Sequence, residues 1–353
     1  MRIFSLLAVM AMVACATVPP AEKKAGTLEV AVSSALQMAS VAASEDGRIF
    51  VATPQWGGPR HLGVAEVKNG QLVAYPDEKW NAWDGDVAHA AEQFVCAHAV
   101  YVHGGALWVV DPASPEFSGA VPEGLKLVKI DLATNQVSHV YALGGAAPKA
   151  SYVQDVRIDD KRGLAYLADA MGGALITVDL KTGAFKRHFE GVAALQAEPG
   201  YTATIQGKPW LGADGQPPKI GVDGLELDPA KDVIYLHPLD GKTLWRIPAA
   251  ALERDDASKL EQVTSTGAAD GLLLGAVGAL LVTSLEDDSV KQVAADGRVT
   301  TLVTDKRLAW PDTLAWEKSG SLLISASQIH RGAGFNGGAD KTEKPFQVFR
   351  FTP

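Results

Sequence analysis

The chain has 353 residues, 47% of them hydrophobic and 21% charged, a balance typical of a folded globular protein and not of a disordered chain. Its 35 glycines and 19 prolines follow no Gly-X-Y period, which excludes collagen and favours an all-β protein rich in loops. The net charge of −9 and the lack of a Lys/Arg cluster exclude a protein that binds the nucleic-acid backbone, and they suit a neutral or cationic ligand.

Residues 1–14 are predicted to be a signal peptide of the lipoprotein type. A positive start is followed by an apolar run from Ile3 to Val13, and Ala14 stands directly before Cys15. This arrangement resembles the bacterial lipobox, in which the cysteine becomes the lipidated first residue of the mature chain. We expect export to the cell envelope or periplasm, with membrane attachment through a lipid on Cys15 only. Export without a lipid and a cytosolic chain are the alternatives.

Residues 15–27 are expected to form a polar tether, and residues 28–353 the folded domain. Cys96 is the only other cysteine, so a lipidated Cys15 leaves no disulfide within the chain. We expect Cys96 to be a buried, inert thiol. No uncharged apolar run reaches the roughly 18–20 residues that span a bilayer, so no transmembrane helix is predicted. We expect a monomer.

One pattern recurs along the whole domain: a short apolar strand, a turn with Asp or Gly, and further apolar strands. The clearest copy runs from residue 153 to residue 183, and the six copies start near residues 38, 94, 153, 222, 269 and 311. Alternating apolar residues favour strands over helices, and each unit has room for four strands. Repeats of this kind predict a six-bladed β-propeller around a central channel; a β-sandwich or two stacked β domains are the alternatives.

Two segments depart from the repeat, and the last strand has a separate role. Residues 190–221 form an insertion rich in Gly and Pro, of the kind that serves as a binding loop or lid. Residues 248–260 are predicted to contain a short surface helix. The last strand, residues 347–351, must pair to close the ring, and we expect it to join strands near residues 322–325 or 28–32.

Several short sequence motifs in the repeats together resemble those of a known family. They include Tyr75-Pro76-Asp77, Tyr166-Leu167-Ala168-Asp169, Gly221-Val222-Asp223-Gly224, Trp310-Pro311-Asp312 and the run from Gln328 to Gly338. In number and order they resemble the major royal jelly protein/yellow family, specifically its bacterial members, from about residue 47 to the end. The resemblance implies a six-bladed propeller with a central channel. Insect members of that family are linked to pigment chemistry, nutrition and the binding of aromatic amines.

Four repeats begin their inner strand with an aspartate, at Asp155, Asp223, Asp270 and Asp312. Repeat equivalence predicts that these carboxyl groups lie in one ring, where they cannot all stay ionised without a cation. Three readings stay open. A Ca²⁺ or other divalent cation could be bound, a protonated amine ligand could be attracted, or each Asp could be structural and accept N–H groups from nearby loops.

Other candidate ligand-binding residues are His98, at the start of the second inner strand, and Trp210, His330 and Phe335 in loops. The aromatic side chains could form a wall for a ring-shaped ligand. Propeller lactonases of the gluconolactonase type hold a metal with Glu, Asn and Asp side chains near the channel mouth. This chain has Met38-Ala39-Ser40-Val41 where that Glu is wanted and no matching Asn, a departure from the pattern.

These observations predict a propeller that binds a small organic molecule, aromatic or an amine, at the channel mouth. The alternatives are a metal-dependent lactonase or isomerase and a scaffold for protein interactions. The residues specify no certain cofactor and no catalytic residue.

Overall fold

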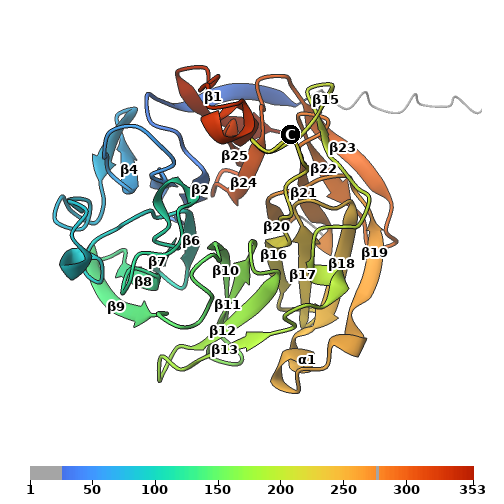
Figure 1. Cartoon of the computed structure of the whole chain (residues 1–353), viewed down its shortest axis with the longest axis horizontal. Helices are drawn as coiled ribbons and strands as arrows, with labels where there is room; N and C mark the ends of the chain where they lie inside the picture. Colours follow the sequence, from blue (N-terminus) through green and yellow to red (C-terminus); the bar gives the residue numbers. More distant parts are fainter. Residues whose placement is uncertain (1–25, 276–277) are drawn as a thin grey trace, which may run out of the picture.

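The computed structural model describes residues 26–275 and 278–353. Its strands form six four-stranded antiparallel sheets arranged around one axis (Figure 1). The first three blades contain β2 (Ser40–Ala43) to β5 (Gln71–Ala74), β6 (Ala99–His103) to β9 (Gln136–Ala142), and β10 (Val153–Asp159) to β13 (Phe185–His188). Their middle strands are β3 (Ile49–Ala52), β4 (Val64–Lys68), β7 (Ala106–Asp111), β8 (Lys126–Asp131), β11 (Leu164–Asp169) and β12 (Ala174–Asp179).

The last three blades follow the same order from the channel outward. The fourth contains β16 (Val222–Asp228), β17 (Val233–Pro238), β18 (Thr243–Pro248) and β19 (Glu261–Ser265). The fifth contains β20 (Leu272–Leu274), β21 (Leu280–Ser284), β22 (Ser289–Val293) and β23 (Val299–Thr304). The sixth contains β24 (Pro311–Trp316), β25 (Leu322–Ala326), β26 (Phe346–Thr352) and β1 (Thr27–Ser34). The prediction of a six-bladed propeller is confirmed, and the six inner strands begin within a few residues of the predicted starts.

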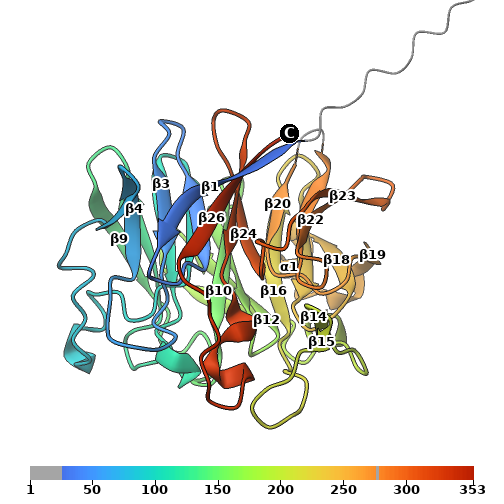
Figure 2. The same cartoon turned by 90° about the horizontal axis from the view of Figure 1, so that it is seen from above.

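The ring is closed by the two ends of the domain. β26 pairs with β25 on one side and with β1 on the other, so the sixth blade combines the last three strands with the first (Figures 1 and 2). The predicted partners of the last strand were residues 322–325 or 28–32, and the strand pairs with both. Both edges of β26 are therefore paired within the sixth blade, and β1 is its outermost strand.

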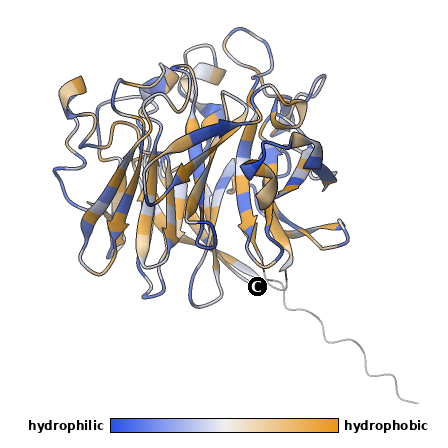
Figure 3. Ribbon diagram, turned by 90° about the horizontal axis from the view of Figure 1, so that it is seen from below, coloured by the Kyte–Doolittle hydropathy of each residue, from blue (hydrophilic) through white to orange (hydrophobic). Residues whose placement is uncertain are grey.

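The core lies between neighbouring blades, because each sheet presents apolar side chains to the sheets on both sides. One cluster joins the second and third blades through buried side chains that include Trp108, Leu127, Ile158, Leu167 and Ile176. The alternation of apolar and polar residues along the strands is visible in Figure 3. Successive side chains point to opposite faces of a strand, so neighbours such as Trp108 and Val109 enter the cores on opposite sides of the sheet.

Two insertions lie at the same end of the propeller. The loop 189–221 leads into the inner strand β16. The loop 327–345 connects β25 to β26, and because β25 is antiparallel to the inner strand β24, this loop lies at the end where β24 starts. Both insertions therefore lie at the end where the inner strands start. The first insertion carries the hairpin β14 (Thr204–Ile205) and β15 (Lys208–Pro209), and the second carries two 3-10 turns, η6 (Ile329–Arg331) and η7 (Ala333–Phe335). Figure 2 shows both insertions on the face opposite the start of β1. We call this face the mouth face.

Helices are few. The predicted surface helix corresponds to α1 (Ala249–Glu253), followed by the 3-10 turn η4 (Ala257–Lys259). The remaining 3-10 turns that are described in full are η1 (Val87–His89), η2 (Pro115–Phe117) and η3 (Ala193–Leu195). Within the described residues, no helix has the length and apolar character needed to cross a bilayer.

Candidate functional site at the channel mouth

The aspartates lie at the start of the inner strands, where the pairing with the next strand is irregular in several blades. In β16 and β24 the pairing with the next strand shifts after the first residue, and Asp223 and Asp312 lie in these bulges. Asp270 comes two residues before the first residue of β20. A bulge re-aims the side chain that it contains. Asp223, Asp270 and Asp312 all line one small cavity at the start of the inner strands.

The four aspartates do come together, but they do not hold one repeat position. Asp155 is the third residue of β10, and the register places Gln154 where the other blades carry Asp223 and Asp312. Asp155 thus lies one residue further along the channel. His98, Asp155, Asp223, Asp270 and Asp312 nevertheless line one small cavity of about 10 Å³. A volume of this size holds about one water molecule.

Burial dominates the electrostatics of this cluster, which we call the carboxyl ring. It raises the pKa of Asp270 to about 7, and it raises the pKa of Asp312 and Asp223 well above the usual range. The neighbouring carboxylates of Asp270, Asp312 and Asp155 raise the pKa of Asp223 further. At neutral pH the ring therefore holds protons.

Asp270 and Asp312 differ in the hydrogen bonds that their carboxyl groups accept. The indole N–H of Trp310 donates to Asp270 Oδ2 at 2.8 Å. Neither carboxyl oxygen of Asp312 meets a donor among the described residues, although its side chain is buried. The hydroxyl of Ser327 lies near Asp312 and lowers its pKa, but no hydrogen bond joins the two side chains.

The chemistry of the ring suits a hard cation, since buried carboxylate oxygens are the ligands that Ca²⁺ takes. The geometry does not match this chemistry. In the part of the chain that the structure describes, no three His, Cys, Asp or Glu side chains converge as metal ligands do. The expected divalent cation is therefore not supported by the arrangement of these side chains.

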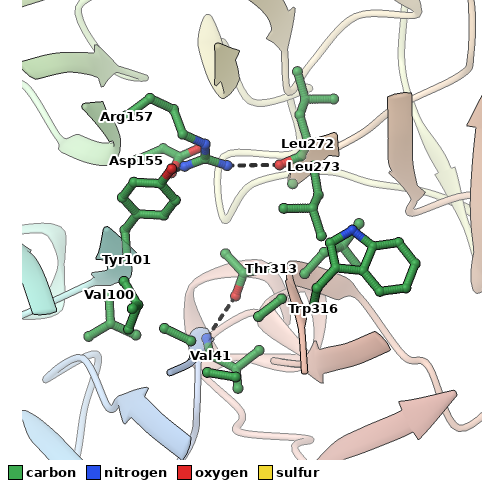
Figure 4. Close-up of a pocket in the computed structure, with 15 residues that line it drawn as sticks. Val41, Val100, Tyr101, Asp155, Arg157, Leu272, Leu273, Thr313 and Trp316 are labelled. Carbon is green, nitrogen blue, oxygen red and sulfur yellow. Dashed lines mark hydrogen bonds and ion pairs between the residues drawn. The ribbon is translucent and has the colours of Figure 1, made fainter. Parts of the chain in front are cut away.

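Beyond the ring, the channel widens into a chamber of about 190 Å³ (Figure 4). Apolar side chains of the inner strands form most of its wall, and Asp155 and Arg157 supply its charge. Arg157 lies across the fourth blade: it pairs with Asp155 at 2.5 Å, approaches Glu226 at 3.2 Å and donates to the carbonyl oxygen of Leu272 at 2.8 Å. Burial opposes the charge of Arg157, but the two carboxylates outweigh burial and raise its pKa.

His98 faces the channel as predicted, and aromatic rings surround it. Its ring lies edge-on to Trp56 at 5.5 Å and to Tyr152 at 5.2 Å between centroids, and the indole N–H of Trp56 donates to the hydroxyl of Tyr152. Burial lowers the pKa of His98 to about 3, so the side chain is neutral at pH 7. His98 and its neighbours thus close one side of the mouth with uncharged rings.

The other predicted residues meet in a second, larger cavity on the mouth face. Trp210, His330 and Phe335 all line this cavity of about 390 Å³, which we call the mouth cavity. Trp210 packs on Phe335 with ring centroids 5.1 Å apart. Residues of β14 and β15 and of the loop 327–345 complete the lining, so both insertions build it. The first insertion, which the sequence predicts to be a binding loop or lid, thus forms part of this cavity.

Trp310 connects the mouth cavity to the carboxyl ring. While its indole N–H bonds Asp270, its ring stacks on His330 at 5.8 Å and meets Trp210 edge-on at 4.9 Å. Trp310 is fully buried, and its backbone has a φ of 60°. Sequence reasoning missed Trp310, Arg157 and Glu226. Trp310 could have been found from its position directly before Pro311-Asp312. Arg157 and Glu226 could have been found because they follow Asp155 and Asp223 by two and three residues in the inner strands.

Comparison with solved structures shows the same fold at low identity. A virginiamycin B lyase from Staphylococcus aureus is 10% identical with a TM-score of 0.52, and the match covers 93% of this chain and 99% of the lyase. A gluconolactonase from Xanthomonas campestris is 12% identical with a TM-score of 0.57, covering 92% and 89%. A calcium-binding protein, regucalcin, from Agrobacterium tumefaciens is 12% identical with a TM-score of 0.56, covering 91% and 93%. No curated protein matches the chain.

A family model identifies the chain more closely. The model of the major royal jelly protein matches residues 98–329, which include the inner strands of the second to sixth blades, the carboxyl ring and the first insertion. The match covers more than half of the chain and agrees with the resemblance seen in the sequence. The chain therefore belongs to the major royal jelly protein family.

Proposed function

We propose that the protein binds a small aromatic molecule in the mouth cavity. The observation that carries this proposal is the wall formed by Trp210, His330 and Phe335 around a cavity of about 390 Å³. Cavities of roughly 300–1,000 Å³ with an apolar wall and a few polar groups are typical small-molecule sites. Aromatic faces favour a flat ring, which they can meet in stacked or edge-on geometry.

The carboxyl ring is a less suitable place for an organic ligand. Its cavity of about 10 Å³ is too small for any molecule larger than water or a bare ion. The chamber beyond it is larger but is lined by an ion network that is already paired within the protein. We therefore assign the ligand to the mouth cavity. The carboxyl ring is then a buried group of residues beneath this cavity, connected to it by Trp310, which contacts both Asp270 and His330.

A screen of aromatic compounds by thermal shift, followed by calorimetry, tests the proposal. Phe335→Leu should weaken the binding of a hit about two- to tenfold, since one aromatic contact contributes roughly 0.5–1.5 kcal/mol. Phe185→Leu, a half-exposed position on β13 away from the cavity, is the matched control and should bind normally. A hit that binds Phe335→Leu and wild type equally would contradict this location, and a screen without hits would favour the scaffold function.

The rival function is that of a metal-dependent lactonase or isomerase. Its support is the fold shared with the gluconolactonase and with the calcium-binding regucalcin. Because the described side chains do not converge as ligands, we derive no catalytic step through a metal. Elemental analysis of the purified protein separates the two functions: a stoichiometric divalent metal that Asp312→Asn abolishes would favour the enzyme.

We also propose that a lipid on Cys15 anchors the protein in the cell envelope; Cys15 lies outside the described residues. β1 begins at Thr27 beside Thr352, at the end of the sixth blade opposite Pro311. An anchor that precedes β1 would thus leave the mouth face turned away from the membrane. Cys15→Ser should move the protein from the membrane fraction to the soluble periplasmic fraction, and a wild-type protein already soluble there would contradict the anchor.

A further inference from the structure

The mouth cavity has two kinds of wall. Trp210, His330 and Phe335 are its aromatic side chains, and the remaining lining includes Lys208, Arg331 and Lys341. We propose that the ligand is an aromatic anion, with its ring against the aromatic wall and its carboxylate, sulfate or phosphate toward the three cationic side chains. This inference rests on the proposed function and names the chemical class of its ligand.

The charge of the lining supports an anion. Glu343 is the one carboxylate in the lining, and it pairs with Arg331 at 3.0 Å between Nη1 and Oε2. Lys208 and Lys341 have no acidic partner within 4 Å among the described residues. Burial lowers the pKa of His330 to about 4, so His330 adds no charge at pH 7. Two positive charges in the cavity are thus uncompensated.

Acidic groups near the cavity do not reverse this balance. Asp288 does not line the cavity; burial raises its pKa to about 6, so it is still mostly ionised at pH 7, but among the cationic side chains of the lining its charge acts on Arg331 and not on Lys208 or Lys341. Asp340 accepts the backbone N–H and the hydroxyl of Thr342 in its own turn. The cationic lining therefore contrasts with the formal charge of −9 for the whole chain, from which a neutral or cationic ligand was expected.

Arg331 is held in place from both insertions. Its guanidinium donates to Gln206 Oε1 at 3.2 Å, from the β14–β15 hairpin, and to Gln328 Oε1 at 3.3 Å. The N–H of Lys341 donates to the carbonyl oxygen of Arg331 at 2.9 Å. Because Arg331 also pairs with Glu343, it stays in place as part of the lining, and Lys208 and Lys341 supply the positive charge that is left for a ligand. Lys208 and Lys341 approach the same space from different loops, so an anion there would be shared between the two insertions.

Four matched probes test the inference by calorimetry at pH 7 and low salt. They are indole-3-acetate, indoxyl sulfate, the neutral indole-3-acetamide and the cationic tryptamine. We expect at least one anion to bind ~10-fold more tightly than the amide, and tryptamine to bind most weakly. Raising the salt to about 0.5 M should weaken only the anion, because screening acts on the charged pair. The comparison of indole-3-acetate with indoxyl sulfate distinguishes a carboxylate from a sulfate-like ligand.

Substitution of the two lysines tests whether they cause the preference for an anion. Lys208→Gln combined with Lys341→Gln should reduce the affinity for the anion about tenfold, to the level of the amide, and leave the amide unchanged. Lys318→Gln, on the turn between β24 and β25 at the opposite end of the blade, is the control and should behave as wild type. Equal binding of all four probes, or tighter binding of tryptamine, would overturn the anion while the aromatic site stands. Failure of every probe and of the aromatic screen would overturn the proposed function itself.

Discussion

Asp270 shows how burial changes the chemistry of a single carboxyl group. In the unfolded chain an aspartate has a pKa near 4, whereas burial in the ring raises the pKa of Asp270 to about 7. The folded protein consequently binds a proton there that the unfolded chain releases. The stability that this proton supplies is fully present below about pH 4 and is lost as the pH rises to about 7.

Asp270→Asn should therefore change the pH dependence of stability. Asparagine keeps an oxygen that can accept the indole N–H of Trp310 but carries no charge at any pH. Relative to wild type, the variant should gain stability between pH 4 and pH 7, by up to roughly 1.4 kcal/mol per pH unit. Urea denaturation at several pH values measures the difference, and a difference that stays constant over this range would contradict the raised pKa.

At the scale of the element, the inner strands are held together by close backbone contact. A Cβ on Gly224 would meet the carbonyl oxygen of Asp270 in the next blade, and a Cβ on Gly271 would meet the carbonyl oxygen of Asp312. Neither glycine has a left-handed backbone, so the requirement is for space and not for conformation. This contact explains why Asp223 and Asp270 are each followed by glycine: the residue after the carboxylate touches the neighbouring blade.

Gly271→Ala should destabilise the protein by about 1–3 kcal/mol, because backbone of the fifth and sixth blades must move apart to admit the methyl group. Gly144→Ala, where a Cβ would meet no atom within 4 Å, is the matched control and should change stability little. Thermal and urea denaturation measure both variants. A Gly271→Ala protein as stable as wild type would show that the blades are not in the close contact described.

On the scale of the whole molecule, stability depends on closure. β26 makes the connection between β25 and β1, and its side chains enter the clusters on both sides of the sixth blade, as Val348 and Phe349 do. These two residues are neighbours in the strand and point to opposite faces. β26 therefore contributes to the contacts of the sixth blade with both the first and the fifth blades.

Deletion of residues 346–353 should consequently unfold the whole domain. It would separate β1 from its blade, expose the edge of β25 and remove apolar side chains from two inter-blade clusters. Circular dichroism and calorimetry of the truncated chain check this result. A truncated protein that melts cooperatively within a few degrees of wild type would contradict the dependence on closure.

The sequence by itself determined the fold and its repeats. Apolar alternation and the recurring turn residues established six units, and phrases such as Trp310-Pro311-Asp312 indicated the family that the model of residues 98–329 confirms. These features are local, because strand periodicity and turn chemistry depend on residues that are close in the chain. The aspartates of the ring could be recognised for the same reason, since each stands near the start of an inner strand.

The tertiary structure alone decided what surrounds these residues. A shift in the pairing of β10 moves Asp155 out of the repeat position, and Arg157 reaches Leu272 across the fourth blade, a contact between residues far apart in the chain. The mouth cavity likewise joins Trp210 and Phe335 from separate insertions without repeat periodicity. Burial, and with it the pKa of Asp270, follows from the closing of all six blades. Such properties depend on distances across the ring, which no local pattern in the sequence encodes.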